Sequence, residues 1–310
     1  CTWHSWLCDD FGFLNKGIEY GNRSCEIAKE FQEDHYLYFK SLAGVGYNKF
    51  RMGHASECVK IGERLLEYGK KYSQIRSIGM GHFIKACGYI NSGEFTKSIL
   101  ALEEAILISA DPLYKAIFRI SLIFPYLIKG DMIKAEEIHS KASHFCDRSG
   151  CGRFKFFIKQ FKGLFFLKKG QLAGGFKILK ENEHVFKNEK RLSSLLQTEF
   201  VIGKMYLEII QGKNSLKFLS FLKNIGFIVQ HVPSAEKKAM YYYTQALDLA
   251  EEIGAIGHKA HAHLDLGIIH KIKKRNGLAK EHLKKAIEIF EETGAFSFLK
   301  QANKELKGLT

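Results

Sequence analysis

The sequence predicts an all-α fold, an α-solenoid in which antiparallel helical hairpins stack into a right-handed superhelix. Three observations predict it. Only three prolines (Pro112, Pro125 and Pro233) interrupt the 310 residues, so long helices are possible. Small residues recur along the chain at the spacing expected of paired helices. Hydrophobic residues make up 46% of the chain, which is enough to form a buried core and argues against disorder.

The clearest repeat lies near the C-terminus. Gly267 is followed twelve positions later by Ala279, and Leu283 and Ala286 follow Ala279 by four and seven positions. Two antiparallel helices approach closely only where their side chains are small. This spacing resembles the tetratricopeptide (TPR) signature, which implies a hairpin of two helices in each repeat.

The same template recurs upstream and predicts one solenoid over residues 1–310. In chain order, the small residues that pair a first helix with a second are Ala43 with Ala55, Ala86 with Ser98, Gly163 with Gly175 and Gly203 with Ala239, and Ala135 anchors a further second helix. Ser98, Ala135 and Gly175 lie 37 and 40 positions apart, close to the period of helical-hairpin repeats. The predicted repeats cover 36–70, 79–110, 116–147, 156–188, 196–253 and 259–293, with a capping helix at 297–309.

One interval breaks the period. Gly175 and Ala239 are 64 positions apart, and the excess falls between two segments that match the template well. Residues 213–232 are therefore predicted to be an insertion within the 196–253 repeat. The chain also starts at Cys1 without a methionine and continues into apolar residues such as Trp3, which predicts a fragment of a longer chain.

The C-terminal half resembles a narrower group of proteins. The segments that carry the resemblance are 232–239 (VPSAEKKA), 245–255 (QALDLAEEIGA), 262–267 (AHLDLG) and 286–295 (AIEIFEETGA). They resemble the C-terminal TPR region of bacterial multidomain adenylate/guanylate cyclases with an AAA-type ATPase module, best over residues 196–308. The resemblance implies a regulatory or sensory role. The catalytic parts of that family would precede Cys1, so no catalytic residue is transferred.

No motif in this chain predicts an enzyme or a cofactor site. The nearest approach to a phosphate-binding loop, Gly62 to Gly69-Lys70, has six intervening residues where the motif has four. His258, His261, His263 and His270 cluster along the sequence, but no cysteine or paired carboxylate completes a metal-ligand set. We interpret these histidines as helix-surface or groove residues, and we expect no catalytic, cofactor or metal site.

Charge supplies the competing functional hypothesis. The net charge is +14, and residues 153–191 hold eleven basic and three acidic residues. Basic residues interleaved with phenylalanines can bind an anion or nucleic acid, although the helical spacing also fits core phenylalanines under a solvated face. The alternative is therefore a basic anion-binding or nucleic-acid-binding repeat protein. The predicted basic patch comprises Arg153, Lys155, Lys159, Lys162, Lys168 and Lys169.

The favoured hypothesis is a non-catalytic scaffold that binds a protein or peptide, including upstream domains of the same polypeptide. In such arrays the first helices line a concave groove that accepts a peptide or a helix. The predicted groove residues, two, five or nine positions into each first helix, are Phe83, Cys87, Ile120, Phe124, Gln160, Leu164, Phe200, Lys204, Leu264 and Ile268. Seven scattered cysteines and no apolar run long enough to span a membrane predict a cytoplasmic protein.

Overall fold

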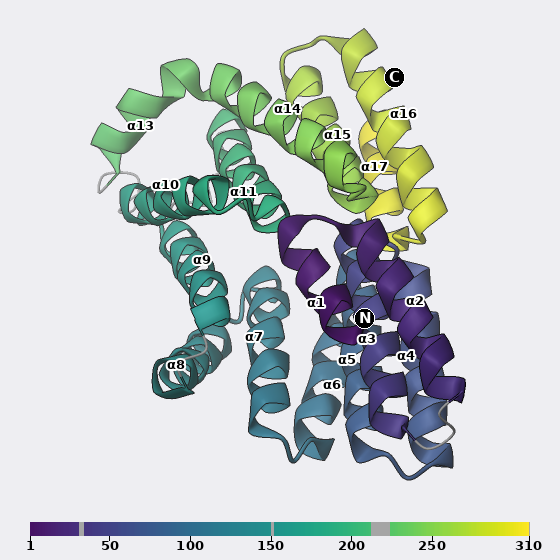
Figure 1. Ribbon diagram of the computed structural model, residues 1–310. Helices are drawn as coiled ribbons and strands as arrows, with labels where there is room; N and C mark the ends of the chain where they lie inside the picture. Colours follow the sequence, from purple (N-terminus) through teal and green to yellow (C-terminus); the bar gives the residue numbers. More distant parts are fainter. Residues whose placement is uncertain (31–33, 150–151, 212–223, 310) are drawn as a thin grey trace. The chain divides into compact units, whose positions relative to one another are not determined.

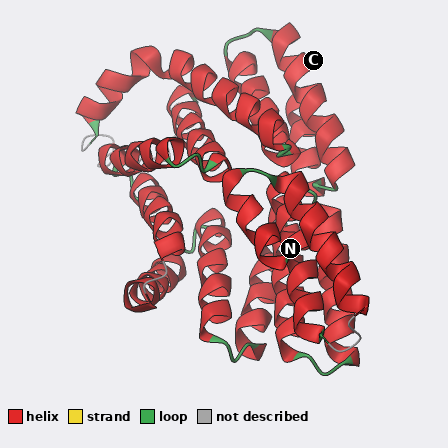
Figure 2. Ribbon diagram, in the orientation of Figure 1, coloured by secondary structure: helices red, strands yellow, loops and turns green. Residues whose placement is uncertain are grey.

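The computed structural model describes residues 1–30, 34–149, 152–211 and 224–309, and all of the regular structure in these ranges is helical (Figures 1 and 2). The predicted all-α class is therefore confirmed. The chain divides into two compact units, which are described separately. Unit 1 comprises Cys1–Gly150 with Glu291–Phe298, and unit 2 comprises Cys151–Phe290 with Leu299–Thr310.

Unit 1 is a stack of antiparallel hairpins. Its helices are α1 (Thr2–Phe11), α2 (Leu14–Glu30), α3 (His35–Met52), α4 (Ala55–Lys71), α5 (Ile75–Ser92), α6 (Phe95–Ile108), α7 (Pro112–Lys129) and α8 (Met132–Ser149). Each helix packs against the next from α1 to α8, and the first helices α1, α3 and α5 also contact one another in order. This is the packing expected of stacked hairpins, in which each repeat contacts its neighbours.

Unit 2 follows the same plan with an interruption. Its helices are α9 (Gly152–Lys168), α10 (Leu172–Asn188), α11 (Leu192–Ile210), α13 (Ile225–His231), the 3-10 turn η1 (Val232–Ser234), α14 (Ala235–Ile253), α15 (Ile256–Ile272), α16 (Asn276–Thr293) and α17 (Phe296–Lys307), the last two reaching into the residues grouped with unit 1. α11 packs against α14 although they are separated in sequence. Of the predicted insertion, 213–223 lies outside the described residues and the remainder contains α13.

Glycines in the left-handed conformation end the first helices of unit 1. Gly12, Gly53, Gly93 and Gly130 follow α1, α3, α5 and α7 with φ of 80°, 98°, 78° and 82°. A side chain is disfavoured at such angles, so glycine is the usual residue at this position. No repeat was predicted before residue 36. The structure has a further hairpin there, α1–α2, in which Gly12 ends the first helix.

A close helix approach in unit 1 depends on two facing glycines on α4 and α5. A Cβ added to Gly81 would lie 2.8 Å from the carbonyl oxygen of Gly62, and one added to Gly62 would lie 2.7 Å from the carbonyl oxygen of Gly81. A backbone carbonyl cannot move away from an added Cβ as easily as the end of a flexible side chain can. The small residues therefore set the distance between the two helices, as the template supposed.

This contact gives a matched pair of variants on α5. Gly81→Ala is expected to destabilise unit 1 by about 1–3 kcal/mol through overpacking, beyond the gain in helix propensity. In Gly79→Ala the new Cβ has no neighbour nearer than 3.7 Å, so we expect a gain of up to about 1 kcal/mol. Trp3 and Trp6, the two tryptophans, both lie on α1, so tryptophan fluorescence during guanidinium unfolding measures unit 1. Equal stability of the two variants would contradict the glycine argument.

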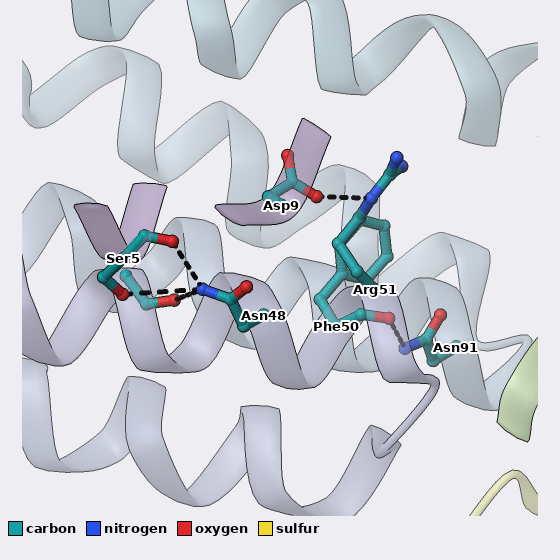
Figure 3. A network of polar contacts seen from close by, with 7 residues as sticks. Ser5, Asp9, Asn48, Phe50, Arg51 and Asn91 are labelled. Carbon is teal, nitrogen blue, oxygen red and sulfur yellow. Dashed lines mark hydrogen bonds and ion pairs between the residues drawn. The ribbon is translucent and has the colours of Figure 1, made fainter. Parts of the chain in front are cut away.

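A buried polar network also joins the first helices of unit 1 (Figure 3). The Asn48 amide on α3 donates to the backbone oxygens of Ser5 and Gly44, both at 2.9 Å. Arg51 Nε lies 2.6 Å from Asp9 Oδ1 on α1, and both side chains are almost fully buried. Burial opposes the charge of Arg51, but Asp9, Tyr47 and Asp10 outweigh it and raise the pKa of Arg51. These bonds fix the register of α1 on α3.

Candidate binding surface

Three helices of unit 2 meet around the carboxylate of Asp265. Asp265 lies on α15, and its side chain is only 2% exposed. Lys204 on α11 donates to both carboxylate oxygens, at 2.7 and 3.0 Å, and the hydroxyl of Tyr243 on α14 donates to Oδ2 at 2.9 Å. A buried carboxylate needs such partners, because an unpaired charge in the interior is costly.

Aromatic rings lie beside this ion pair. The ring of Phe200, one helical turn before Lys204, lies 5.8 Å from that of Tyr243 and 6.1 Å from those of His258 and His261. Loss of hydration, and secondarily the Lys204 charge, lowers the pKa of His261 to about 3, so this imidazole is neutral at pH 7. Burial, and then Asp265, raises the pKa of Tyr243, which keeps its hydroxyl a donor.

The arrangement presents an oriented cation beside an aromatic ring. The side chain of Lys204 is 45% exposed although its ammonium group is bound to Asp265. Phe200 and His258 are half-buried, so part of each ring reaches the surface. The geometry suits the recognition of a carboxylate or a backbone carbonyl next to an apolar side chain, because the cation is already held in place before binding.

The other predicted groove residues are distributed over both units. In unit 1, Phe83, Cys87 and Ile120 are buried and Phe124 is half-buried. In unit 2, Gln160, Leu264 and Ile268 are buried and Leu164 is half-buried. The buried positions pack between helices of their own unit: Phe83, for example, lies 5.2 Å from Phe118 on α7 and 6.0 Å from Tyr47 on α3. Of the ten, Phe124, Leu164, Phe200 and Lys204 retain exposed surface, and the groove remains a prediction.

Phe200 and Lys204 were among the predicted groove residues, whereas their partners Asp265 and Tyr243 were not. Asp265 stands in the otherwise apolar segment Leu264–Ile269, and that isolated carboxylate was the available signal. The histidines of α15 were predicted to be helix-surface or groove residues, and the structure places His258 and His261 against Phe200. The link between Lys204 and Asp265 spans 61 positions and required the packing of α11 on α15.

The predicted basic patch lies on α9 and on Lys169, the residue directly after this helix. Lys155, Lys162, Lys168 and Lys169 are exposed, while Lys159 pairs with Glu181 on α10 at 2.8 Å. The side chain of Arg153 lies outside the described part of the structure. Of the interleaved phenylalanines, Phe165 is buried and Phe154, Phe156, Phe157, Phe161 and Phe166 are half-buried. The rings therefore contribute to packing while most of the lysines point to solvent.

Over the described ranges, no group of three or more His, Cys, Asp or Glu side chains has an arrangement suited to a metal ion. In the same ranges, no helix has both the length and the apolar character that a membrane crossing requires. Among the cysteines with described positions, Cys1, Cys8, Cys25, Cys58 and Cys87 are free thiols. Burial raises the pKa of Cys25 to about 11 and also raises that of Cys87, so neither is a reactive thiolate at neutral pH.

No protein-family model matches the chain, and no curated protein does either. Solved structures do. The apo form of RapI is 16% identical, with a TM-score of 0.53, over 80% of this chain and 81% of RapI. A Signal Transduction ATPase with Numerous Domains (STAND) protein with a tetratricopeptide repeat sensor, from Pyrococcus horikoshii, is 14% identical with a TM-score of 0.50. The match covers 96% of this chain and 43% of that protein. At these identities the likeness concerns the fold, and the chain has the fold of a TPR-type helical-repeat protein.

Proposed function

We propose that the chain is a non-catalytic protein-interaction scaffold and that the surface around Phe200 and Lys204 binds a polypeptide. The observation that carries the proposal is the Lys204 ammonium, which Asp265 holds in a fixed position beside a partly exposed aromatic ring, while the hydroxyl of Tyr243 donates to the same carboxylate. Helical-repeat proteins bind peptides or helices along their first helices, and α11 and α15 are first helices. A few interface residues, often aromatic ones such as Trp and Tyr, carry most of the binding free energy in protein complexes.

The test compares two aromatic substitutions in unit 2. Phe200→Ser is expected to weaken partner binding about thirtyfold, as loss of an interface anchor worth about 2 kcal/mol does. Tyr241→Ser is the control, because Tyr241 is 54% exposed on the second helix α14. Partners are captured with the whole chain, identified by mass spectrometry and titrated by calorimetry. Equal affinities for wild type and Phe200→Ser, with Tm unchanged, would refute this surface as the binding site.

Lys204 is tested separately because it also stabilises Asp265. Lys204→Arg preserves the charge and is expected to retain most of the affinity, whereas Lys204→Gln is expected to lose it. Both variants keep a hydrogen-bond donor for the buried carboxylate, so the comparison isolates the charge. Similar losses in both would indicate that Lys204 acts only through the packing of α11 on α15.

A second function follows from the exposed lysines of α9 and of the residue after it. Lys155, Lys162 and Lys168 lie on α9, Lys169 follows its last residue, and together they supply a positive surface for an anion or for RNA. If all four contact phosphates of single-stranded RNA, the logarithm of the affinity should fall against the logarithm of salt concentration with a slope of about −3. A scaffold that binds polypeptide through Phe200 should show little salt dependence. Loss of every captured partner after nuclease treatment would favour the basic patch.

We also propose that the repeats serve as the regulatory or sensory region of a larger signalling protein in a reducing, cytoplasmic compartment. The resemblance of residues 196–308 to the repeat region of multidomain cyclases supports this role. Reading the gene upstream of the codon for Cys1 tests it, because cyclase and AAA-type ATPase domains are expected there.

A further inference from the structure

Two imidazoles face each other across the last full hairpin of unit 2. His263 on α15 and His282 on α16 approach with their Nδ1 atoms 2.9 Å apart, and the ring planes are 41° from parallel. His263 is 7% exposed and His282 is half-buried. Without a metal the two nitrogens share one proton, one ring donating and the other accepting.

We propose that His263 and His282 form a two-histidine site for a divalent transition-metal ion, with Zn²⁺ as the ion to be tested. Neutral imidazole nitrogen is a preferred ligand of Zn²⁺, Co²⁺, Ni²⁺ and Cu²⁺. On binding, the shared proton moves from Nδ1 to Nε2 of the same ring, so both rings stay neutral and both Nδ1 lone pairs face the ion. Water completes the coordination, since the structure supplies only these two ligands.

The geometry requires a small adjustment. With Zn–N bonds of about 2.0–2.1 Å in a tetrahedral arrangement, two nitrogen ligands lie about 3.4 Å apart. The Nδ1 atoms must therefore separate by about 0.5 Å, which rotation of the half-buried His282 ring provides.

Neighbouring groups support the site without acting as ligands. The ring of His270 stacks on that of His282, with centroids 5.4 Å apart and planes within 17°, so it presents its face and not a nitrogen. The nearby cation Lys285 is paired with Glu281 at 2.7 Å, which reduces its repulsion of a bound metal.

The test uses the whole chain without a histidine tag and measures Tm with EDTA and with saturating Zn²⁺. At a hundredfold excess over the dissociation constant we expect a rise of about 4–8 °C. His282→Gln should abolish the rise, and His258→Gln, which alters a histidine of the same hairpin outside the pair, should preserve it. His282 is half-buried, and the Tm of His282→Gln in EDTA shows that this variant folds.

Co²⁺ spectroscopy separates histidine from cysteine ligands. Thiolate ligands give a sulfur-to-cobalt charge-transfer band that imidazole ligands lack, so its absence supports the histidine pair. A charge-transfer band, an equal Zn²⁺ effect on wild type and His282→Gln, or no effect on wild type would each overturn the proposal. The Phe200→Ser binding test is independent of this result, so failure of the metal site leaves the scaffold function standing.

Discussion

Arg51→Met is expected to destabilise unit 1 by about 3–5 kcal/mol, because it leaves the buried carboxylate of Asp9 without its cation. Arg51 is 5% exposed and Asp9 1% exposed, so water cannot replace the lost partner. Methionine has about the length of the aliphatic part of arginine, which limits the cavity. The change is measured as the guanidinium unfolding midpoint followed by tryptophan fluorescence. Trp6 reports it directly, since its indole NH donates to the backbone oxygen of Lys40 on α3.

A double-mutant cycle separates the ion pair from the packing around it. Asp9→Leu/Arg51→Met removes both charges, and we expect it to recover most of the stability lost in Arg51→Met, because replacing a buried ion pair by apolar residues is often nearly neutral. Arg23→Met is the control, since Arg23 is an exposed arginine on α2 of the same unit. If the double variant were as unstable as the single one, shape and not the uncompensated charge would explain the loss.

The repeat template predicted helices from local periodicity, and it succeeded where periodicity is the cause of the structure. Gly62 and Gly267 lie where a neighbouring helix is too close for a larger side chain, and Ala86 is fully buried. The spacing of small residues in the sequence therefore follows the spacing of the helix contacts. The template missed α1–α2, although Gly12 has the same left-handed conformation that ends α3, α5 and α7. One glycine in a segment without other matches is a weak signal when read alone.

The polar pairs could not be predicted, because they depend on residues far apart in sequence. Lys204 reaches Asp265 over 61 positions, and Asp9 reaches Arg51 between two first helices. The histidine cluster shows the same limit. His263 was noted for its sequence neighbours His258, His261 and His270, but its partner is His282 on the next helix. Such contacts depend on how far one helix is shifted along its neighbour, and this register cannot be read from the sequence.

Glu199→Gln is expected to make unit 2 more stable at pH 8 and to leave it nearly unchanged at pH 5. Glu199 on α11 is 6% exposed, and its Oε2 atom has no hydrogen-bond partner. Burial, and then repulsion from Glu183, raises the pKa of this carboxyl from its ordinary 4.5 to about 7. A raised pKa in the folded state means that folding favours the protonated form. The stability contribution is therefore complete below pH 4.5 and is lost as the pH rises through 7.

Glutamine resembles the protonated acid in shape and cannot ionise, so the variant avoids the cost of burying the charge. A shift of this size corresponds to at most about 3 kcal/mol at pH 8, and hydration of the carboxylate by local opening will reduce it. Hydrogen-exchange mass spectrometry of the α10 and α11 peptides measures the change within unit 2, where tryptophan is absent from the described helices. Glu208→Gln, on the exposed face of the same helix, should show no pH-dependent difference from wild type. Protection of α11 that is equal in wild type and Glu199→Gln at pH 8 would mean that Glu199 ionises freely, and that its carboxylate finds water or a cation on the surface of unit 2.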